Sequence, residues 1–303
     1  MTAALDTLLA RLRPELGALE GAPEMLSGGI TNRNYRVRLG GADYVVRVTS
    51  PESSVLGIDR VAEHAAGLSA ARLGVGPEVA AFLPDAGCLV TRFISGRPVP
   101  PEELRVPETL GAVARSVRAF HDGPRIPSTF NAFRIVEDYA QEAHERGATL
   151  PAAYSDASRI AAQIEPALTG EEHRPVPCHN DLLNANLIHD GRVVRIVDWE
   201  YAGMGDRYFD LGNLSVNNEL REEDEERLLA AYFGAPCTSR RFACLRLLRL
   251  MSDFREAMWG VVQSAVSTLD FDFVDYATRH FARLAAGAAD PRYADWLRDA
   301  RER

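Results

Sequence analysis

The segment 178–210 constrains this chain more than any other part, because it predicts a short β-hairpin flanked by polar loops. Residues 187–188 form an apolar stretch, Asp190-Gly191 is typical of a hairpin turn, and residues 193–197 form a second strand. The residues just before and just after a hairpin meet at its open end. The two flanking loops are therefore expected to build one site.

Three oxygen-bearing side chains occupy those loops, with Asp181 and Asn186 before the hairpin and Asp198 after it. An aspartate near a hydroxyl can accept its proton, whereas an amide oxygen and a second carboxylate can hold Mg²⁺ against nucleotide phosphates. Asn186 and Asp198 fall at the two open ends of the hairpin, close enough to share one ion. The segment therefore indicates a phosphotransferase.

The bulk properties place the chain among globular proteins. At 303 residues it can bury a sizeable core in two lobes or domains, and its hydrophobic fraction of 46% is ordinary. No apolar run approaches a membrane helix, and residues 1–30 carry charges where a signal peptide needs an apolar stretch. Its four cysteines show neither a paired secretory framework nor a CxxC spacing. A cytoplasmic protein without membrane insertion is expected.

The net charge of the chain limits the classes of molecule that it is expected to bind. The net charge of −9 disfavours a nucleic-acid partner and suits a cationic small-molecule substrate. All 34 basic residues are arginine, because no lysine occurs in the sequence. Any cationic side chain used in catalysis must therefore be an arginine. No pattern in the chain indicates its oligomeric state.

Residues 1–94 read mainly as strands. Leucines at helical spacing in residues 5–12 predict an opening helix before Pro14, and a second helix is expected at residues 59–73. Apolar runs separated by glycine pairs or polar loops predict five strands, at residues 25–27, 35–39, 43–48, 78–83 and 88–94.

The predicted secondary structure changes from mainly strands to mainly helices at residue 95. Glycine and prolines in residues 96–101 are typical of a linker, and most of the remaining chain has helical periodicity. Helices are expected at residues 109–121, 135–145, 152–168, 222–233, 241–267 and 273–286. We therefore expect an α+β protein with two domains, residues 1–94 and residues 95–303.

The polar residues around the hairpin also resemble a known pattern. Protein kinases carry a catalytic loop H-R-D-x-x-x-x-N that is followed by D-F-G. The matching positions here are His179, Asn180, Asp181, Asn186, Asp198, Trp199 and Glu200. The segment resembles the choline/ethanolamine kinase and aminoglycoside phosphotransferase families, whose fold is similar to that of protein kinases. The resemblance implies a two-lobed protein-kinase-like fold, with nucleotide bound by the first lobe and the catalytic loop and acceptor site in the second.

The resemblance further implies a set of ATP-binding residues. A glycine loop between the first two strands resembles the GGxTN loop of choline kinases, and glycine lets backbone N–H groups approach phosphate oxygens closely. This loop contributes Ser27, Gly28, Gly29, Thr31 and Asn32.

Two further contacts to ATP are implied by position. Arg47 on the third strand stands where protein kinases have a phosphate-gripping lysine, and Glu63 on the following helix is the matching acid. The planar fork of arginine can bind phosphate with two nitrogens and does not titrate. Backbone groups of Arg92 and Ile94 are expected to bind adenine.

The same resemblance to kinases implies a catalytic or structural role for several residues. Asp181 is expected to orient and deprotonate the substrate hydroxyl, while Asn186 and Asp198 ligate Mg²⁺ through oxygen. His179 is expected to support the loop rather than act on substrate. Asp210 is expected to anchor the backbone of the catalytic loop.

The later helices bear on the acceptor. Residues 254–279 look like the region after the catalytic core of choline and ethanolamine kinases, which implies that Trp259 and Tyr276 face a cationic acceptor. Aromatic faces bind ammonium groups by cation–π attraction, and Glu200 is expected to add negative charge there, as could Glu219, Asp253 or Glu256.

Three functions remain open on this basis. The first is an ATP- and Mg²⁺-dependent kinase for a small amino alcohol, choline or ethanolamine. The second is the same fold with another acceptor, such as an aminoglycoside, a different amino alcohol or an amino acid. The third is a non-catalytic binding module, which the complete set of expected catalytic residues disfavours.

Overall fold

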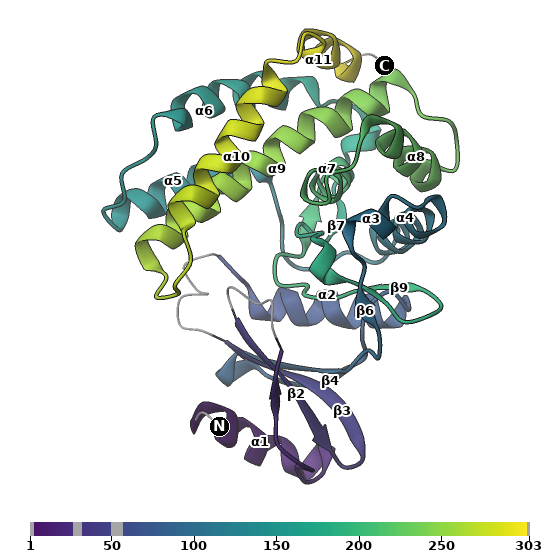
Figure 1. The fold of residues 1–303 in the computed structure, drawn as a ribbon, viewed down its shortest axis with the longest axis vertical. Helices are drawn as coiled ribbons and strands as arrows, with labels where there is room; N and C mark the ends of the chain where they lie inside the picture. The colour runs from purple at the N-terminus through teal and green to yellow at the C-terminus, as the bar shows by residue number, and fades with distance from the viewer. Residues whose placement is uncertain (1–2, 27–31, 50–56, 302–303) are drawn as a thin grey trace.

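The computed structural model describes residues 3–26, 32–49 and 57–301. A five-stranded antiparallel sheet, ordered β1-β2-β3-β5-β4, lies at the end of the molecule opposite the C-terminus (Figure 1). Its strands are β1 (Glu24–Met25), β2 (Asn32–Leu39), β3 (Ala42–Thr49), β4 (Val79–Leu83) and β5 (Cys88–Arg92). The five expected strands are confirmed, although β5 ends at Arg92 instead of Ile94.

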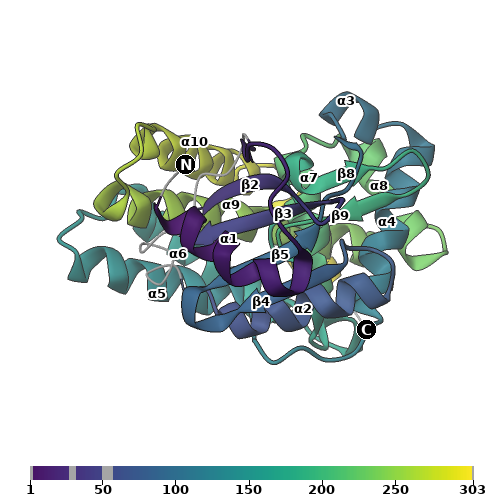
Figure 2. The same ribbon diagram turned by 90° about the horizontal axis from the view of Figure 1, so that it is seen from below.

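Helix α1 (Ala3–Leu16) lies across this sheet, as Figure 2 shows. Its apolar stripe forms a small core with inward-facing side chains of β2, β3 and β5. The helix was expected to end before Pro14, but it continues to Leu16. A proline in the last turn forfeits only its own N–H bond, and burial of the leucine stripe holds the helix in place. The buried members of that stripe are Leu5, Leu8, Leu9 and Leu12.

Helix α2 (Arg60–Arg72) connects the sheet to the rest of the molecule. It begins at Asp59, whose carboxylate accepts hydrogen bonds from two backbone N–H groups of the first turn, at 2.9 and 3.1 Å. The helix contacts β4, yet its buried Ala66 and Ala70 belong to the large core of the helical part. Glu63, in the first turn, is thereby held where the sheet and the helices meet.

The remaining chain is mostly helical and surrounds one long central helix, α9 (Ser239–Val266). Helix α9 contacts α5, α7, α10 and α11, and nearly all of its middle section is buried. The other helices are α3 (Pro101–Leu104), α4 (Pro107–His121), α5 (Ala132–Glu145), α6 (Ala153–Ile164), α7 (Arg207–Asn217), α8 (Glu222–Phe233), α10 (Phe273–Ala288) and α11 (Tyr293–Arg301).

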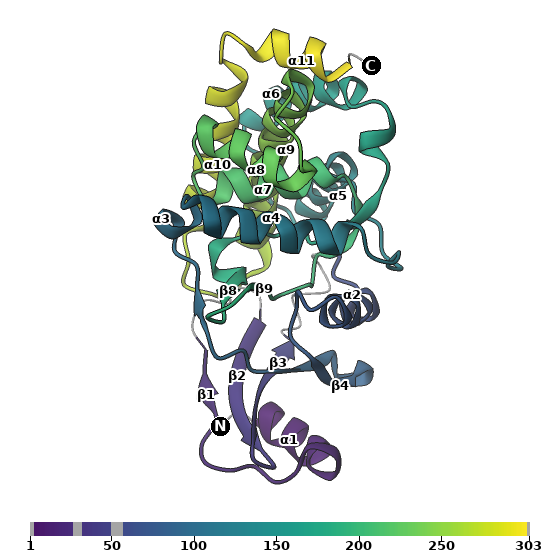
Figure 3. The ribbon, with the colours of Figure 1, turned by 90° about the vertical axis from the view of Figure 1, so that its right-hand side faces the viewer.

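Five short strands lie between the sheet and the helices, and Figure 3 shows two of them, β8 and β9, at this level. A three-stranded sheet has the order β6-β8-β9, and β10 pairs with β7. The five are β6 (Arg97–Pro98), β7 (Val176–Cys178), β8 (Leu187–His189), β9 (Val194–Ile196) and β10 (Gly203–Gly205).

Helix α7 is an element that the sequence analysis missed. Its residues include asparagine, glycine and serine, which are weak helix formers, so only tertiary packing explains the helix. Gly212 sits where α7 crosses α9, and a Cβ there would lie 2.7 Å from the backbone nitrogen of Arg249. Glycine therefore permits the close approach that holds α7 in the core.

Two sequence-based expectations can be compared directly with the described residues. All four cysteines are free. No helix within residues 3–26, 32–49 and 57–301 is both long enough and apolar enough to cross a membrane. The division of the chain at residues 94 and 95 stays a prediction.

Candidate active site

The expected hairpin is formed by β8 and β9. Leu187 pairs with Ile196, and the N–H of Val197 donates to the carbonyl of Asn186 at 3.0 Å. This last bond holds the residues next to Asp198 against Asn186 at the open end of the ribbon. The structure thus brings together the two oxygen donors that the sequence assigned to a metal ion.

The loop that carries Asp181 is anchored by a buried carboxylate on α7. Asp210 accepts hydrogen bonds from the backbone N–H groups of His179 (2.7 Å) and Asn180 (2.6 Å), and from the ring of His121 (2.9 Å). Asn180 has a φ of 68°, a conformation that few residues other than glycine adopt. The anchor holds this unusual turn, and the role expected for Asp210 is confirmed.

Replacement of Asp210 by alanine is expected to destabilise the protein strongly. Two buried N–H groups would lose their acceptor, and each costs about 1–3 kcal/mol when unpaired. We expect a marked fall in melting temperature and a loss of phosphoryl transfer, measured by thermal unfolding and enzyme assay.

Asp190→Ala is the matched control for Asp210→Ala. Asp190 also accepts two backbone N–H groups, from Arg192 and Val193, both at 2.9 Å, but in an exposed turn where water can replace it. A loss of stability in Asp190→Ala as large as that in Asp210→Ala would contradict the anchoring role.

His179 is a structural residue of the loop, as expected. Its Nδ1 accepts the N–H of Asp181 at 3.2 Å, so the neutral ring carries its proton on Nε2, which donates to the carbonyl of Val197 at 2.9 Å. Burial lowers the pKa of His179. The imidazole therefore joins the loop before the hairpin to the residue before Asp198.

Asp181 lies beside Asn186. The amide nitrogen of Asn186 donates to the carbonyl of Asp181 at 2.9 Å and to its carboxylate at 3.3 Å, so the amide oxygen of Asn186 is left for another partner. Burial raises the pKa of Asp181 well above its usual range, although Arg255 acts in the opposite direction. The two side chains thus stand side by side, a carboxylate next to an amide oxygen that could bind a metal ion.

Arg47 is the centre of a buried ion cluster. Its guanidinium pairs with Glu63, as expected, and also with Asp198. Although burial alone would lower it, these carboxylates, with Asp198 the strongest, raise the pKa of Arg47. The cluster joins the sheet, α2 and the hairpin at one point.

Glu200 lies in the same cluster, where the sequence analysis had assigned it to the acceptor. It is 3.7 Å from Arg47 and 3.3 Å from Arg60. Burial, together with repulsion from Asp198, raises the pKa of Glu200 to about 7. Its observed ion pairs therefore connect Glu200 to Arg47, the arginine expected to bind phosphate.

A cavity of about 360 Å³ opens beside this cluster, between the sheet and the hairpin. Arg47, Asn186 and Asp198 lie at its polar end, and mostly apolar side chains form its walls. The Oδ1 of Asn34 also lines the cavity and has no hydrogen-bond partner among the described residues. The apolar walls come from both sides and include Leu26, Val45, Val79, Leu89, Ile188 and Val197.

The residues expected to bind ATP can be compared with this cavity. Arg92 and Ile94 both line it, and the N–H of Arg92 donates to the carbonyl of Glu78 at 2.8 Å. The binding of adenine by backbone groups of Arg92 and Ile94 stays a prediction. Of the glycine loop, Ser27, Gly28, Gly29 and Thr31 lie outside the described residues, and Asn32 begins β2.

The aromatic residues expected near the acceptor form a cluster at the junction of α9 and α10. The ring centroids of Trp259 and Tyr276 are 5.6 Å apart, and Trp259 donates to the hydroxyl of Tyr201 at 3.1 Å. The hydroxyl of Tyr276 donates to Glu256 at 2.7 Å. Trp259 is nearly fully buried, so it packs as a core residue in this structure.

Arg255 is a site residue that the sequence analysis missed. Its Nη1 is 3.9 Å from the carboxylate of Asp181, although the two residues are far apart in the chain. An Arg255-Glu256 pair in the middle of the most deeply buried helix is an unusual signal, because charged residues are seldom buried unless paired.

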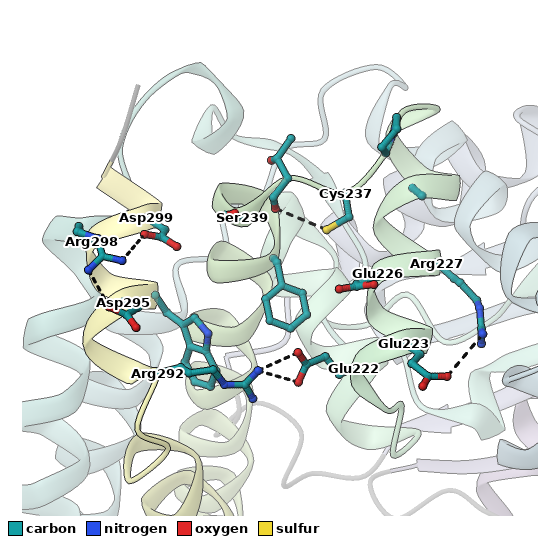
Figure 4. A pocket seen from close by; sticks show the side chains of 15 residues that line it. Glu222, Glu223, Glu226, Arg227, Cys237, Ser239, Arg292, Asp295, Arg298 and Asp299 are labelled. Atoms are coloured by element: carbon teal, nitrogen blue, oxygen red, sulfur yellow. Dashed lines mark hydrogen bonds and ion pairs between the residues drawn. The ribbon is translucent and has the colours of Figure 1, made fainter.

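A second cavity, of about 830 Å³, lies between α8, the start of α9 and α11 (Figure 4). None of the expected site residues lines it. Several of its carboxylates pair with neighbouring arginines, as Glu222 does with Arg292 at 2.8 Å. The groups suited to phosphoryl transfer are therefore gathered at the hairpin.

An antiparallel sheet, a helical part and a cluster of carboxylate, amide and arginine side chains between them are typical of a kinase-like phosphotransferase. Residues 24–248 match the phosphotransferase enzyme family. A solved choline/ethanolamine kinase family protein from Mesorhizobium loti is 32% identical, with a TM-score of 0.85, covering 98% of this chain and 99% of that one. The chain therefore belongs to the phosphotransferase enzyme family and, within it, to the choline/ethanolamine kinase family.

Two further relatives give the range of the similarity. Ethanolamine kinase 2 from Homo sapiens is 28% identical over 219 residues, which cover 64% of this chain and 57% of the human protein. The structure of choline kinase LicA from Streptococcus pneumoniae is 22% identical with a TM-score of 0.80, covering 95% of this chain and 99% of that one. At that identity the likeness establishes the shared fold.

Proposed function

We propose that this enzyme transfers the terminal phosphoryl group of ATP, with Mg²⁺, to the hydroxyl of a small amino alcohol, choline or ethanolamine. The observation that carries the proposal is that Arg47, Asn186 and Asp198 line one cavity while Asp181 lies beside it, in contact with Asn186. Each supplies a different function that phosphoryl transfer requires: a base, metal ligands and a phosphate-binding cation.

The residues present suit a metal nucleotide. The amide oxygen of Asn186 and the carboxylate of Asp198 are the hard oxygen donors that Mg²⁺ prefers. The unpaired Oδ1 of Asn34 and the apolar walls fit a purine nucleoside. When bound, ATP supplies the phosphoryl group and Mg²⁺ neutralises charge on its phosphates. We propose that residues 1–94 contribute most of the nucleotide contacts, and residues 95–303 the catalytic loop and acceptor site.

The protein's own groups would orient the acceptor. Asp181 accepts a hydrogen bond from the acceptor hydroxyl and takes its proton during transfer. Arg47, kept charged by its carboxylate partners, contacts phosphate oxygens without titrating. His179 and Asp210 keep the backbone of this loop in place and touch no reacting atom.

The choice of an amino alcohol rests on relatives and on local chemistry. Proteins named ethanolamine kinase and choline kinase match this chain, and Trp259 and Tyr276 pack against each other in the region expected to hold the acceptor. Both remain candidates for acceptor contact, together with Glu200. A non-catalytic role is disfavoured because every residue that the chemistry needs is present.

An ADP-release screen tests this function. The purified protein is incubated with ATP and Mg²⁺ and with choline, ethanolamine, related amino alcohols or a panel of aminoglycosides. Release of ADP with choline or ethanolamine above the acceptor-free rate supports the proposal, whereas turnover with aminoglycosides alone moves the acceptor to that class. No turnover with any acceptor, combined with no Mg-ATP binding by calorimetry, would exclude the enzymatic function.

A further inference from the structure

Arg255 is a buried cation inside the expected acceptor site. It extends from the middle of α9, and its side chain is only 2% exposed. Placing an arginine at such a position is costly unless its nitrogen groups find acceptors. The hydrogen-bond partners of each nitrogen therefore indicate which group Arg255 could bind.

Among the described residues, only the Nη1 atom of the Arg255 guanidinium has a hydrogen-bond partner. The Nη1 donates to Glu256 at 2.6 Å and lies 3.9 Å from Asp181. The Nε and Nη2 atoms are buried and have no hydrogen-bond partner among residues 3–26, 32–49 and 57–301. These two nitrogens form one edge of the planar group, the edge that binds a carboxylate with two parallel hydrogen bonds.

Arg255 also occupies the aromatic surface that a substrate cation would need. Its guanidinium carbon lies 4.3 Å from the centroid of the Tyr201 ring, a cation–π contact. Glu256 is engaged on both oxygens, because Tyr276 donates to the second one at 2.7 Å. A quaternary ammonium group would meet the fixed positive charge of Arg255 at the Tyr201 ring.

The position of Arg255 relative to Asp181 identifies the side from which a ligand arrives. Arg47 and Asp198 line the nucleotide cavity, whereas Arg255 lies with Tyr201 and the aromatic cluster of α9 and α10 and lines no part of that cavity. The unpaired edge of Arg255 therefore lies outside the cavity proposed for the nucleotide, near Asp181.

We propose that the Nε and Nη2 edge of Arg255 binds a carboxylate of the acceptor, so that the phosphorylated molecule is a hydroxylated amine that also carries a carboxylate. The inference rests on the proposed phosphoryl transfer and changes its acceptor class from choline or ethanolamine to hydroxy amino acids. Such an acceptor gives the unpaired nitrogens their missing partners while its hydroxyl reaches Asp181.

The matched pair L-serine and serinol tests this inference on the unmodified enzyme. Both are ethanolamine with one added group, a carboxylate in L-serine and an uncharged hydroxymethyl group in serinol. We expect kcat/KM for L-serine, or for its longer homologue L-homoserine, to exceed that for serinol and ethanolamine by about tenfold or more. A preference for ethanolamine or serinol over both carboxylates would overturn the inference and leave the proposed function intact.

A variant then links the preference to Arg255. Arg255→Lys keeps a positive charge but lacks the two-nitrogen edge, so the ratio of kcat/KM for L-serine to that for serinol should fall about tenfold. Arg279→Lys, on the exposed face of α10, is the matched control and should leave the ratio unchanged. An equal loss of kcat/KM with every acceptor would indicate that Arg255 contacts the transferred phosphoryl group. That result would contradict a carboxylate-binding role for Arg255.

Binding measurements separate failure of this inference from failure of the proposed function. Calorimetric titration of the wild-type protein with L-serine and with serinol, each in the presence of Mg-ADP, needs neither turnover nor a variant that folds. Tighter binding of L-serine than of serinol supports carboxylate binding by Arg255 even if no ADP is released in any assay. Equal or weaker binding of L-serine overturns it, whatever the result of the ADP-release screen.

Discussion

Asp181→Asn is expected to lower kcat by about 10²–10⁴-fold, the range that a positioned general base contributes. The amide has nearly the same shape as the carboxylate, so its oxygen can keep the contact that Asn186 makes at 3.3 Å. It cannot accept the proton of the acceptor hydroxyl. Nucleotide affinity should stay nearly constant, because Asp181 does not line the nucleotide cavity.

Single-turnover phosphorylation and calorimetric titration with Mg-ATP measure these two effects separately. Asp190→Asn, at the exposed turn of the same hairpin, controls for a general effect of removing a carboxylate. If Asp181→Asn kept more than about one tenth of the wild-type kcat, Asp181 could not be the base.

Asp198→Ala should instead abolish the dependence of nucleotide binding on Mg²⁺. The variant loses one of the two proposed oxygen ligands and also a carboxylate partner of Arg47. We expect the Kd of Mg-ATP to rise by about tenfold or more, a change of about 1.4 kcal/mol or more, toward the value measured with ATP and EDTA. Without Asp198 the ion can no longer bridge the protein and the phosphates.

The comparison of the two variants is the sharper test. Asp181→Asn should separate catalysis from nucleotide binding, while Asp198→Ala should impair both. Melting temperatures show whether each variant is folded. An equal loss of ATP binding in the two variants would contradict the division of labour between base and metal ligand.

Local sequence patterns predicted much of the architecture because they report local physics. Alternating apolar residues and glycine turns gave the five strands of the sheet, and the Asp190-Gly191 turn gave the hairpin β8–β9. Helical periodicity gave α4, α5 and α8–α10 within a few residues. Helix α7 escaped because its own residues favour turns, and its stability comes from packing on α9 through Gly212.

The site shows the same division between local pattern and long-range contact. The spacing of Asp181, Asn186 and Asp198 was sufficient to predict their common location, because a short hairpin holds them. Arg255 could not be placed from sequence, since its approach to Asp181 depends on how α9 crosses the catalytic loop. The bond from the N–H of Arg92 to Glu78 likewise depends on strand pairing at the edge of the sheet.

The sequence by itself determined the chemical groups of this protein: the carboxylates and the amide around one hairpin, arginine as the sole type of basic side chain other than histidine, and a resemblance to a family with phosphotransferase activity. The tertiary structure alone decided which of these groups face one another. It set Glu200 against Arg47 and put Arg255 on Tyr201 beside Asp181. The physical reason is that backbone periodicity is encoded over a few neighbouring residues, whereas the charge environment of a buried site is assembled from elements that are distant in the chain.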